Sequence, residues 1–134
     1  MIKEDYVSAK IARLLEKKGF DETCYACYEY FESGVTLYKG WMFEYKGIPV
    51  HNSSERIKCP TQQMVMKWLR EVHKIFIEIG VSIDLNGKYH YGFRLLNSTC
   101  KNILEPKDLV KMGFKDTYEE ACEASIKYTL ENLI

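Results

Sequence analysis

The stretch that decides the fold spans residues 75–95 and reads IFIEIGVSIDLNGKYHYGFRL. Isoleucine, valine and leucine occupy every second position of its first half, and aromatic residues alternate in the same way in its second half. Alternation of apolar and other side chains is typical of a strand with one buried face. Asn86-Gly87 lies between the two runs and is a strong turn signal. The stretch therefore predicts a β-hairpin.

The register of this hairpin follows from the same alternation. A two-residue Asn86-Gly87 turn would place the two apolar rows on opposite faces, whereas a three-residue loop over 85–87 places them on one face. The longer loop pairs Asp84 with Lys88. It also pairs Ile77 with Leu95, Glu78 with Arg94, Ile79 with Phe93, Val81 with Tyr91, Ser82 with His90 and Ile83 with Tyr89. We expect Tyr89, Tyr91 and Phe93 to point into the core with the isoleucines.

Three helices are predicted around the hairpin. The first covers 5–18 and ends before Gly19 and Phe20, the pattern of a Schellman ending. The second begins after Pro60, with Thr61 as its N-cap, and ends near His73, with Val65, Trp68, Leu69 and Val72 on its buried face. The third covers 117–133, where Thr117 and Glu120 have the spacing of a capping box.

The remaining segments complete an α-ββ-α-ββ-α order. Residues 23–32 are rich in aromatic side chains and predict a strand, Ser33-Gly34 predicts a turn, and 35–45 predicts a second strand. We expect a loop over 46–59 and an irregular segment over 97–116 that contains a helical turn at 107–112. The fold class is therefore α+β, a two-layer sandwich with an antiparallel sheet and helices mainly on one face. Residues 1–134 are expected to form a single domain.

Composition excludes several functional classes. The chain has 134 residues, 46% of them apolar, with 19 basic and 19 acidic side chains. It is too apolar to be disordered, and its balanced charge argues against a binder of nucleic acid. No apolar run approaches the roughly 18 residues that a membrane-spanning helix needs. The N-terminus has no apolar signal-peptide region, and the five cysteines have no disulfide-framework spacing, so a cytoplasmic protein with reduced thiols is expected.

The motifs that suggest chemistry have structural explanations. Cys24 and Cys27 form a CxxC pair, but they lie in a strand-like run and not at a helix N-terminus, where a redox thiol would be activated. Residues 88–93 resemble the aromatic signature of the RNA-recognition motif, but the glycine stands in the wrong place and the β-α-β order is missing. Neither a phosphate-binding loop nor a hydrolase motif is present. The sequence therefore assigns no catalytic, metal-binding or cofactor-binding residue and favours a non-enzymatic role.

Two segments carry a family resemblance. Residues 59–79, CPTQQMVMKWLREVHKIFIEI, and residues 116–134, DTYEEACEASIKYTLENLI, resemble a small protein family of Bacteroides-group bacteria and their prophages. That family has no assigned activity, so the resemblance implies an accessory gene of a mobile element and no site residues. The beginning of the second segment also resembles the last helix of HicB-type antitoxins.

The leading functional hypothesis is a protein–protein interaction module, which could also form a homodimer. Its candidate surface consists of aromatic residues in a region whose two strand faces are both partly apolar: Tyr25, Tyr28, Tyr30, Trp41, Phe43 and Tyr45. A weaker candidate is a basic helix face formed by Lys67, Arg70 and Lys74. The alternatives are a small-ligand or nucleotide-sequestering protein, with a pocket between the 46–59 loop and the first hairpin, and an antitoxin-like partner-binding protein.

Overall fold

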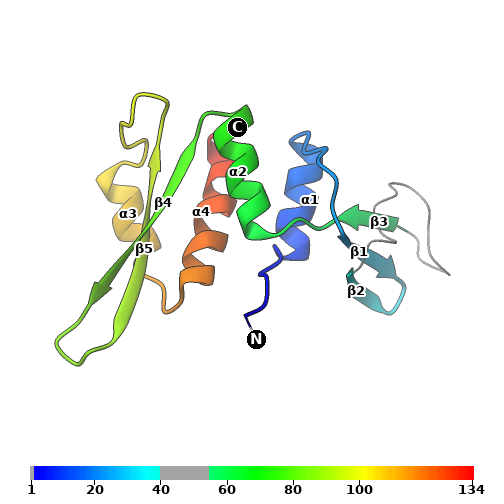
Figure 1. Cartoon of the computed structure of the whole chain (residues 1–134), viewed down its shortest axis with the longest axis horizontal. Coiled ribbons are helices and arrows are strands. Elements are labelled where there is room, and N and C mark those ends of the chain that lie inside the picture. Colours follow the sequence, from blue (N-terminus) through cyan, green and yellow to red (C-terminus); the bar gives the residue numbers. More distant parts are fainter. Residues whose placement is uncertain (1, 40–54) are drawn as a thin grey trace. The chain divides into compact units, whose positions relative to one another are not determined.

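The computed structural model of the chain describes residues 2–39 and 55–134. It contains helices and antiparallel strands, so the predicted α+β class is confirmed, with the strands divided between two sheets (Figure 1). Contacts within the chain group it into two units, Met1–Thr61 and Gln62–Ile134. The single domain expected from the sequence stays a prediction. Among the described residues no helix has the length and apolar character needed to cross a membrane.

The first unit begins with α1 (Ala9–Lys17), which is shorter than the predicted helix over 5–18. Ser8 explains the later start, because its hydroxyl accepts a hydrogen bond from the Ile11 N–H and caps the helix there. The predicted ending is confirmed. Gly19 has a φ of 84°, and the Phe20 N–H donates to the Leu15 carbonyl at 3.0 Å.

The sheet of the first unit has β1 (Ala26–Phe31) at its centre, between β2 (Gly34–Lys39) and β3 (Glu55–Lys58). The predicted hairpin is present, but its turn is Glu32-Ser33 and not Ser33-Gly34, because Gly34 already pairs with Phe31 as the first residue of β2. Both flanking strands are antiparallel to β1. The predicted loop over 46–59 is wrong for 55–58, where β3 pairs with the second edge of β1. Such pairing between distant segments has no signal in the local sequence. The part of the predicted strand and loop over 40–54 lies outside the described residues.

The second unit contains α2 (Gln62–Val72), β4 (Phe76–Ile83), β5 (Tyr89–Leu96), α3 (Pro106–Met112) and α4 (Tyr118–Asn132). The predicted pairing of β4 with β5 is confirmed at every position from Ile77–Leu95 to Ile83–Tyr89. Gly87 has a φ of 80°, and the Asp84 N–H donates to the Lys88 carbonyl at 2.9 Å, as the three-residue loop requires. On α2, Val65, Trp68 and Leu69 are buried, but the predicted burial of Val72 is wrong because that side chain is 56% exposed.

Helix α4 covers part of the hairpin. Thr117 caps the helix as predicted, accepting a hydrogen bond from the Glu120 N–H. Ala124, Tyr128 and Leu133 of the helical segment pack against a cluster formed by Phe93, Leu95 and Leu104. Ile77 and Ile79 join the same cluster from β4. The turn end of the hairpin extends beyond this helix (Figure 1).

Candidate interaction surface on the β4–β5 hairpin

The apolar row of the hairpin divides into a covered half and an open half. Phe93 and Leu95 are 6% and 0% exposed, because they belong to the cluster against which α4 packs. Beyond them, the open half consists of Val81 at 62%, Ile83 at 61%, Leu85 at 106% and Tyr89 at 57% exposed. The prediction that Tyr89 points into the core is therefore wrong.

The cover ends near Tyr91. This side chain is half-buried, and its ring meets Tyr118, the first residue of α4, edge to face at 6.4 Å between ring centroids. The alternation of apolar residues continues along the hairpin beyond Tyr91, whereas α4 begins at Tyr118 and does not reach further. The open half is therefore a continuous apolar row that the described residues of the second unit leave accessible to solvent.

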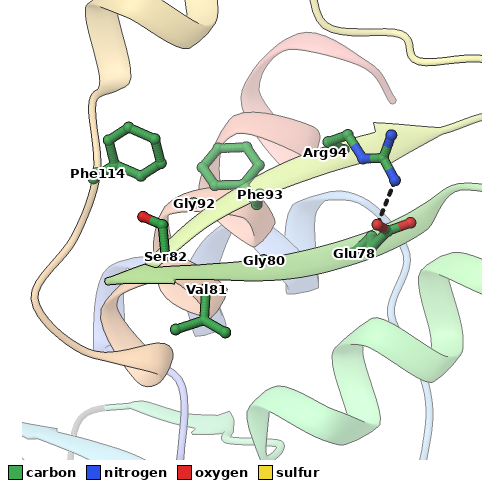
Figure 2. A pocket seen from close by; sticks show the side chains of 8 residues that line it. All are labelled: Glu78, Gly80, Val81, Ser82, Gly92, Phe93, Arg94 and Phe114. Atoms are coloured by element: carbon green, nitrogen blue, oxygen red, sulfur yellow. Dashed lines mark hydrogen bonds and ion pairs between the residues drawn. The ribbon is translucent and has the colours of Figure 1, made fainter. Parts of the chain in front are cut away.

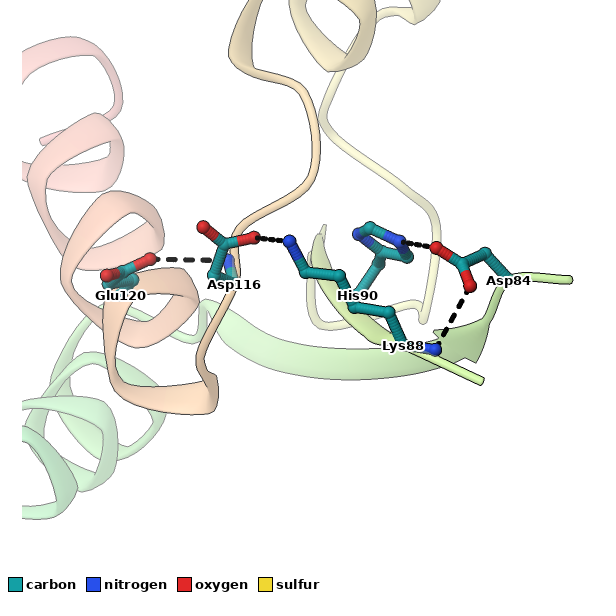
Figure 3. A network of polar contacts seen from close by, with 5 residues as sticks. All are labelled: Asp84, Lys88, His90, Asp116 and Glu120. Atoms are coloured by element: carbon teal, nitrogen blue, oxygen red, sulfur yellow. Dashed lines mark hydrogen bonds and ion pairs between the residues drawn. The ribbon is translucent and has the colours of Figure 1, made fainter. Parts of the chain in front are cut away.

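Polar contacts fix the turn end of the hairpin (Figure 3). The Asp84 carboxylate accepts hydrogen bonds from the N–H groups of Asn86 and Lys88 at 2.8 and 3.0 Å, and it lies 2.9 Å from His90 Nε2. The hydrogen bond with His90, followed by the two backbone bonds, lowers the pKa of Asp84 below its ordinary value. The turn is thus held by an ionised carboxylate.

The same end is tied to the segment before α4. Lys88 Nζ lies 3.1 Å from Asp116 Oδ1, and the Asp116 N–H donates to Glu120 Oε2 (Figure 3). Tyr91 and Lys115 exchange two backbone hydrogen bonds, at 2.9 and 2.7 Å. These contacts orient the open half, which the described helices leave exposed.

The opposite face of the hairpin has a shallow hollow of about 260 Å³ (Figure 2). Gly80 and Gly92 pair at its centre, and the ring of Phe114 lies over Gly92, where an added Cβ would come within 3.0 Å of it. Phe114 itself is 70% exposed. The ion pair of Glu78 with Arg94 bounds one end. Figure 2 shows Ser82 and Val81 on opposite sides of β4, as strand alternation requires.

The aromatic surface predicted from the sequence belongs to the first unit, and the structure describes three of its six residues. Tyr25 is 57% exposed. Tyr28 and Tyr30 are half-buried and have internal contacts: the Tyr28 hydroxyl donates to the Val7 carbonyl at 2.7 Å, and the Arg13 guanidinium stacks over Tyr30 at 4.6 Å. Trp41, Phe43 and Tyr45 lie outside the described residues. The predicted surface as a whole stays a prediction.

The basic face predicted on the second helix has two residues in α2 and one beyond it. Lys67 and Arg70 lie within α2, and Lys67 Nζ is 3.8 Å from a Glu71 carboxylate oxygen. Lys74 follows the helix, has a φ of 57°, and donates to the Glu71 carbonyl at 2.8 Å. The three side chains therefore do not form a single helical row.

Sequence reasoning missed a buried ion pair in the first unit. Glu29 is completely buried, and its Oε1 accepts hydrogen bonds from Arg56 Nη2 at 2.9 Å and Nε at 3.2 Å. Glu29 Oε2 is also buried, and no described residue forms a hydrogen bond with it. The available signal was a glutamate at an inward position of an aromatic strand. Its partner was not visible in advance because β3 was expected to be a loop.

The two cysteines of the CxxC pair have the environment of inert thiols. Burial raises the pKa of Cys24 and of Cys27 to about 11, so both thiols are protonated at neutral pH. Among the described residues no group of histidine, cysteine and carboxylate side chains is arranged to hold a metal ion.

Comparisons with known proteins return no match, whether to protein-family models, to curated proteins or to solved structures.

Proposed function

We propose that the protein is an interaction module that binds another protein chain through the open half of the β4–β5 hairpin. The observation that carries this proposal is the apolar row of Val81, Ile83, Leu85 and Tyr89, which continues past the end of the α4 cover. An accessory role in a mobile element, as the family resemblance implies, is part of the same proposal.

The free energy available on this row suits a protein partner. Complete burial of a valine or isoleucine side chain contributes about 1.5–3 kcal/mol. Val81 and Ile83 are each more than half exposed. A partner that covers both side chains therefore gains a substantial part of this burial free energy from each of them. Tyr89 adds an aromatic side chain, a residue type enriched among the dominant contacts of protein interfaces.

The charges around the row favour a protein over a polyanion. Lys88 lies against Asp116, His90 against Asp84, and Arg94 against Glu78. The lysine and the arginine of the described hairpin thus each have a carboxylate partner, and its described residues form no basic stripe. The affinity of nucleic-acid binders rests on phosphate contacts from unneutralised basic side chains, which this arrangement does not supply.

The test compares three immobilised forms of the chain: the wild type, a Val81→Lys/Ile83→Lys variant, and a Val35→Lys control. Val35 is also exposed, at 42%, but lies on β2 in the first unit. Proteins captured from a lysate of the natural host are quantified, and the best candidate is then purified and titrated directly. We expect binding by the wild type and the control, and its loss in the hairpin variant. Equal binding by all three forms, or by none, would contradict the proposal.

A further inference from the structure

The backbone groups on the outer edge of β4 point away from β5. The Asp84 N–H bonds to the Lys88 carbonyl, so the even-numbered residues of β4 are the ones that bond to β5. The N–H and C=O groups of Ile77, Ile79, Val81 and Ile83 therefore point outward. The bonds of Tyr91 to Lys115, on the far edge of β5, follow the same alternation.

This edge is unpaired over the described part of the chain. Within residues 2–39 and 55–134, the sheet that contains β4 has two strands, β4 and β5. The isolated bridges of this unit are formed by β5. The strand also lacks the usual devices that prevent edge pairing. It contains no lysine, no proline and a single charged residue, Glu78. An exposed edge of this kind is a template for one more strand.

We propose that β4 pairs antiparallel with β4 of a second copy of the chain, around a two-fold axis at Gly80. This inference rests on the proposed function and names its partner. Outward-pointing residues must meet each other, so the sum of paired residue numbers is even. Registers centred on Ile79 and on Gly80 both align seven residues of β4 in each copy, 76–82 and 77–83, but only the register centred on Gly80 pairs all four outward-pointing residues of each strand.

The side chains agree with this register. Ile79 lies opposite Val81 of the second copy, and Ile77 lies opposite its Ile83, all on the same face. The open half of each strand thus adjoins the covered half of the other, which extends the apolar surface across the axis. Such self-complementarity is what a two-fold interface requires.

The polar face agrees as well. Glu78 lies opposite Ser82 of the second copy, and the two Glu78 side chains are about 14 Å apart along the strands. A register centred on Glu78 itself would place two carboxylates face to face. At the axis, the two Gly80 residues form a close pair without hydrogen bonds, with Cα atoms about 4.5 Å apart. Gly80 faces the hollow in Figure 2, and no atom of the described residues lies within 4 Å of a Cβ added there.

The first experiment measures the mass of the full chain by sedimentation velocity over a range of concentrations. A Val81→Pro variant removes an N–H group that points outward. Because this N–H does not bond to β5, the variant blocks the edge while the hairpin is retained. A Val81→Lys variant places a charge on the same edge without altering the backbone. We expect a wild-type dimer and the loss of that dimer in both variants, with circular dichroism showing that the fold is retained. A dimer that persists in both variants overturns edge pairing.

The second experiment tests the register by disulfide formation in a Cys100→Ser background, which removes the exposed native thiol. Gly80→Cys brings two thiols together at the axis, within the Cα separation that a disulfide allows. Ser82→Cys, two residues away on the same face, is the matched control, since its two copies lie too far apart. We expect covalent dimers of the Gly80→Cys form alone on non-reducing gels. Cross-linking of the Ser82→Cys form alone overturns the register.

Failure of this inference is distinguishable from failure of the proposed function. A wild-type chain that remains monomeric at every concentration, with no Gly80→Cys disulfide, overturns pairing with a second copy. If that monomer still captures a different protein, and the capture depends on Val81 and Ile83, the proposed interaction function is retained with that protein as the partner. If it captures none, both proposals fall.

Discussion

The two sheets of this protein use their apolar residues in different ways. In the first unit, β1 has a neighbour on each edge, and two of its tyrosines have internal contacts, Tyr28 with Val7 and Tyr30 with Arg13. In the second unit, no described strand pairs with the outer edge of β4, and the apolar row of the hairpin extends beyond the helix that covers part of it.

The difference shows that the extent of cover, and not the number of aromatic residues, separates a core strand from a candidate binding surface. The regular alternation of the hairpin is the stronger sequence signal for burial, yet Val81 and Ile83 are more than half exposed. The alternation of residues identifies the apolar face of the hairpin. It does not indicate how much of that face α4 covers.

The largest expected effect tests the buried pair that supports β1. Arg56→Ala leaves the Glu29 carboxylate buried without its partner, which costs about 3–5 kcal/mol in the free energy of unfolding. Arg13→Ala is the matched control, because its ion pair with Glu55 is exposed and is expected to contribute about 1 kcal/mol or less. Urea unfolding of both variants measures the contrast. A joint Glu29→Met/Arg56→Met variant should lose much less than Arg56→Ala, since no charge remains buried. Equal losses for Arg56→Ala and Arg13→Ala would refute the structural role of the pair.

A second pair of substitutions compares the two halves of the hairpin. Leu95→Ala in the covered half removes a fully buried side chain and should cost about 2–5 kcal/mol. Ile83→Ala in the open half should cost less than about 1 kcal/mol in the monomer, because its side chain is already in contact with solvent. Thermal unfolding at low protein concentration measures both. A large loss at Ile83 would mean that the open half is part of the core.

Thiol labelling tests how well the first sheet is closed. Cys27 on β1 is buried and has a raised pKa, whereas Cys100 is exposed. At neutral pH we expect one fast-reacting thiol, identified as Cys100 by its loss in a Cys100→Ser variant. Cys27 should react only as the fold opens. Rapid labelling of Cys27 in the native protein would show that β1 is accessible.

The smallest expected effect concerns the turn of the hairpin. The pKa of Asp84 is lowered in the folded chain, so its ionised form stabilises the fold, and that contribution disappears as pH falls below about 4 through the folded pKa. NMR shifts of Asn86 and Lys88 amides follow the titration, and Asp84→Asn should abolish their acid transition. The same transition in the Asp84→Asn variant would exclude this carboxylate as its origin.

The sequence predicted the elements that local patterns determine. The hairpin register, the Gly19 ending of α1 and the Thr117 cap of α4 each follow from a few adjacent residues. It did not predict β3 or the Glu29–Arg56 pair, because both depend on a contact between distant strands. The exposure of the open half of the hairpin could not be predicted for the same reason. Its exposure is set by where α4 begins relative to β5, a tertiary distance without a local signature.

Amide hydrogen exchange along β4, measured by NMR at low and high protein concentration, tests most directly whether its free edge is a binding surface. If β4 pairs with a second copy, the outward amides of Ile79 and Val81 become protected at high concentration. The amide of Gly80, which already bonds to β5, should change little and serves as the internal control. Fast exchange of Ile79 and Val81 at both concentrations, with Gly80 protected throughout, would contradict pairing of the edge with a second copy.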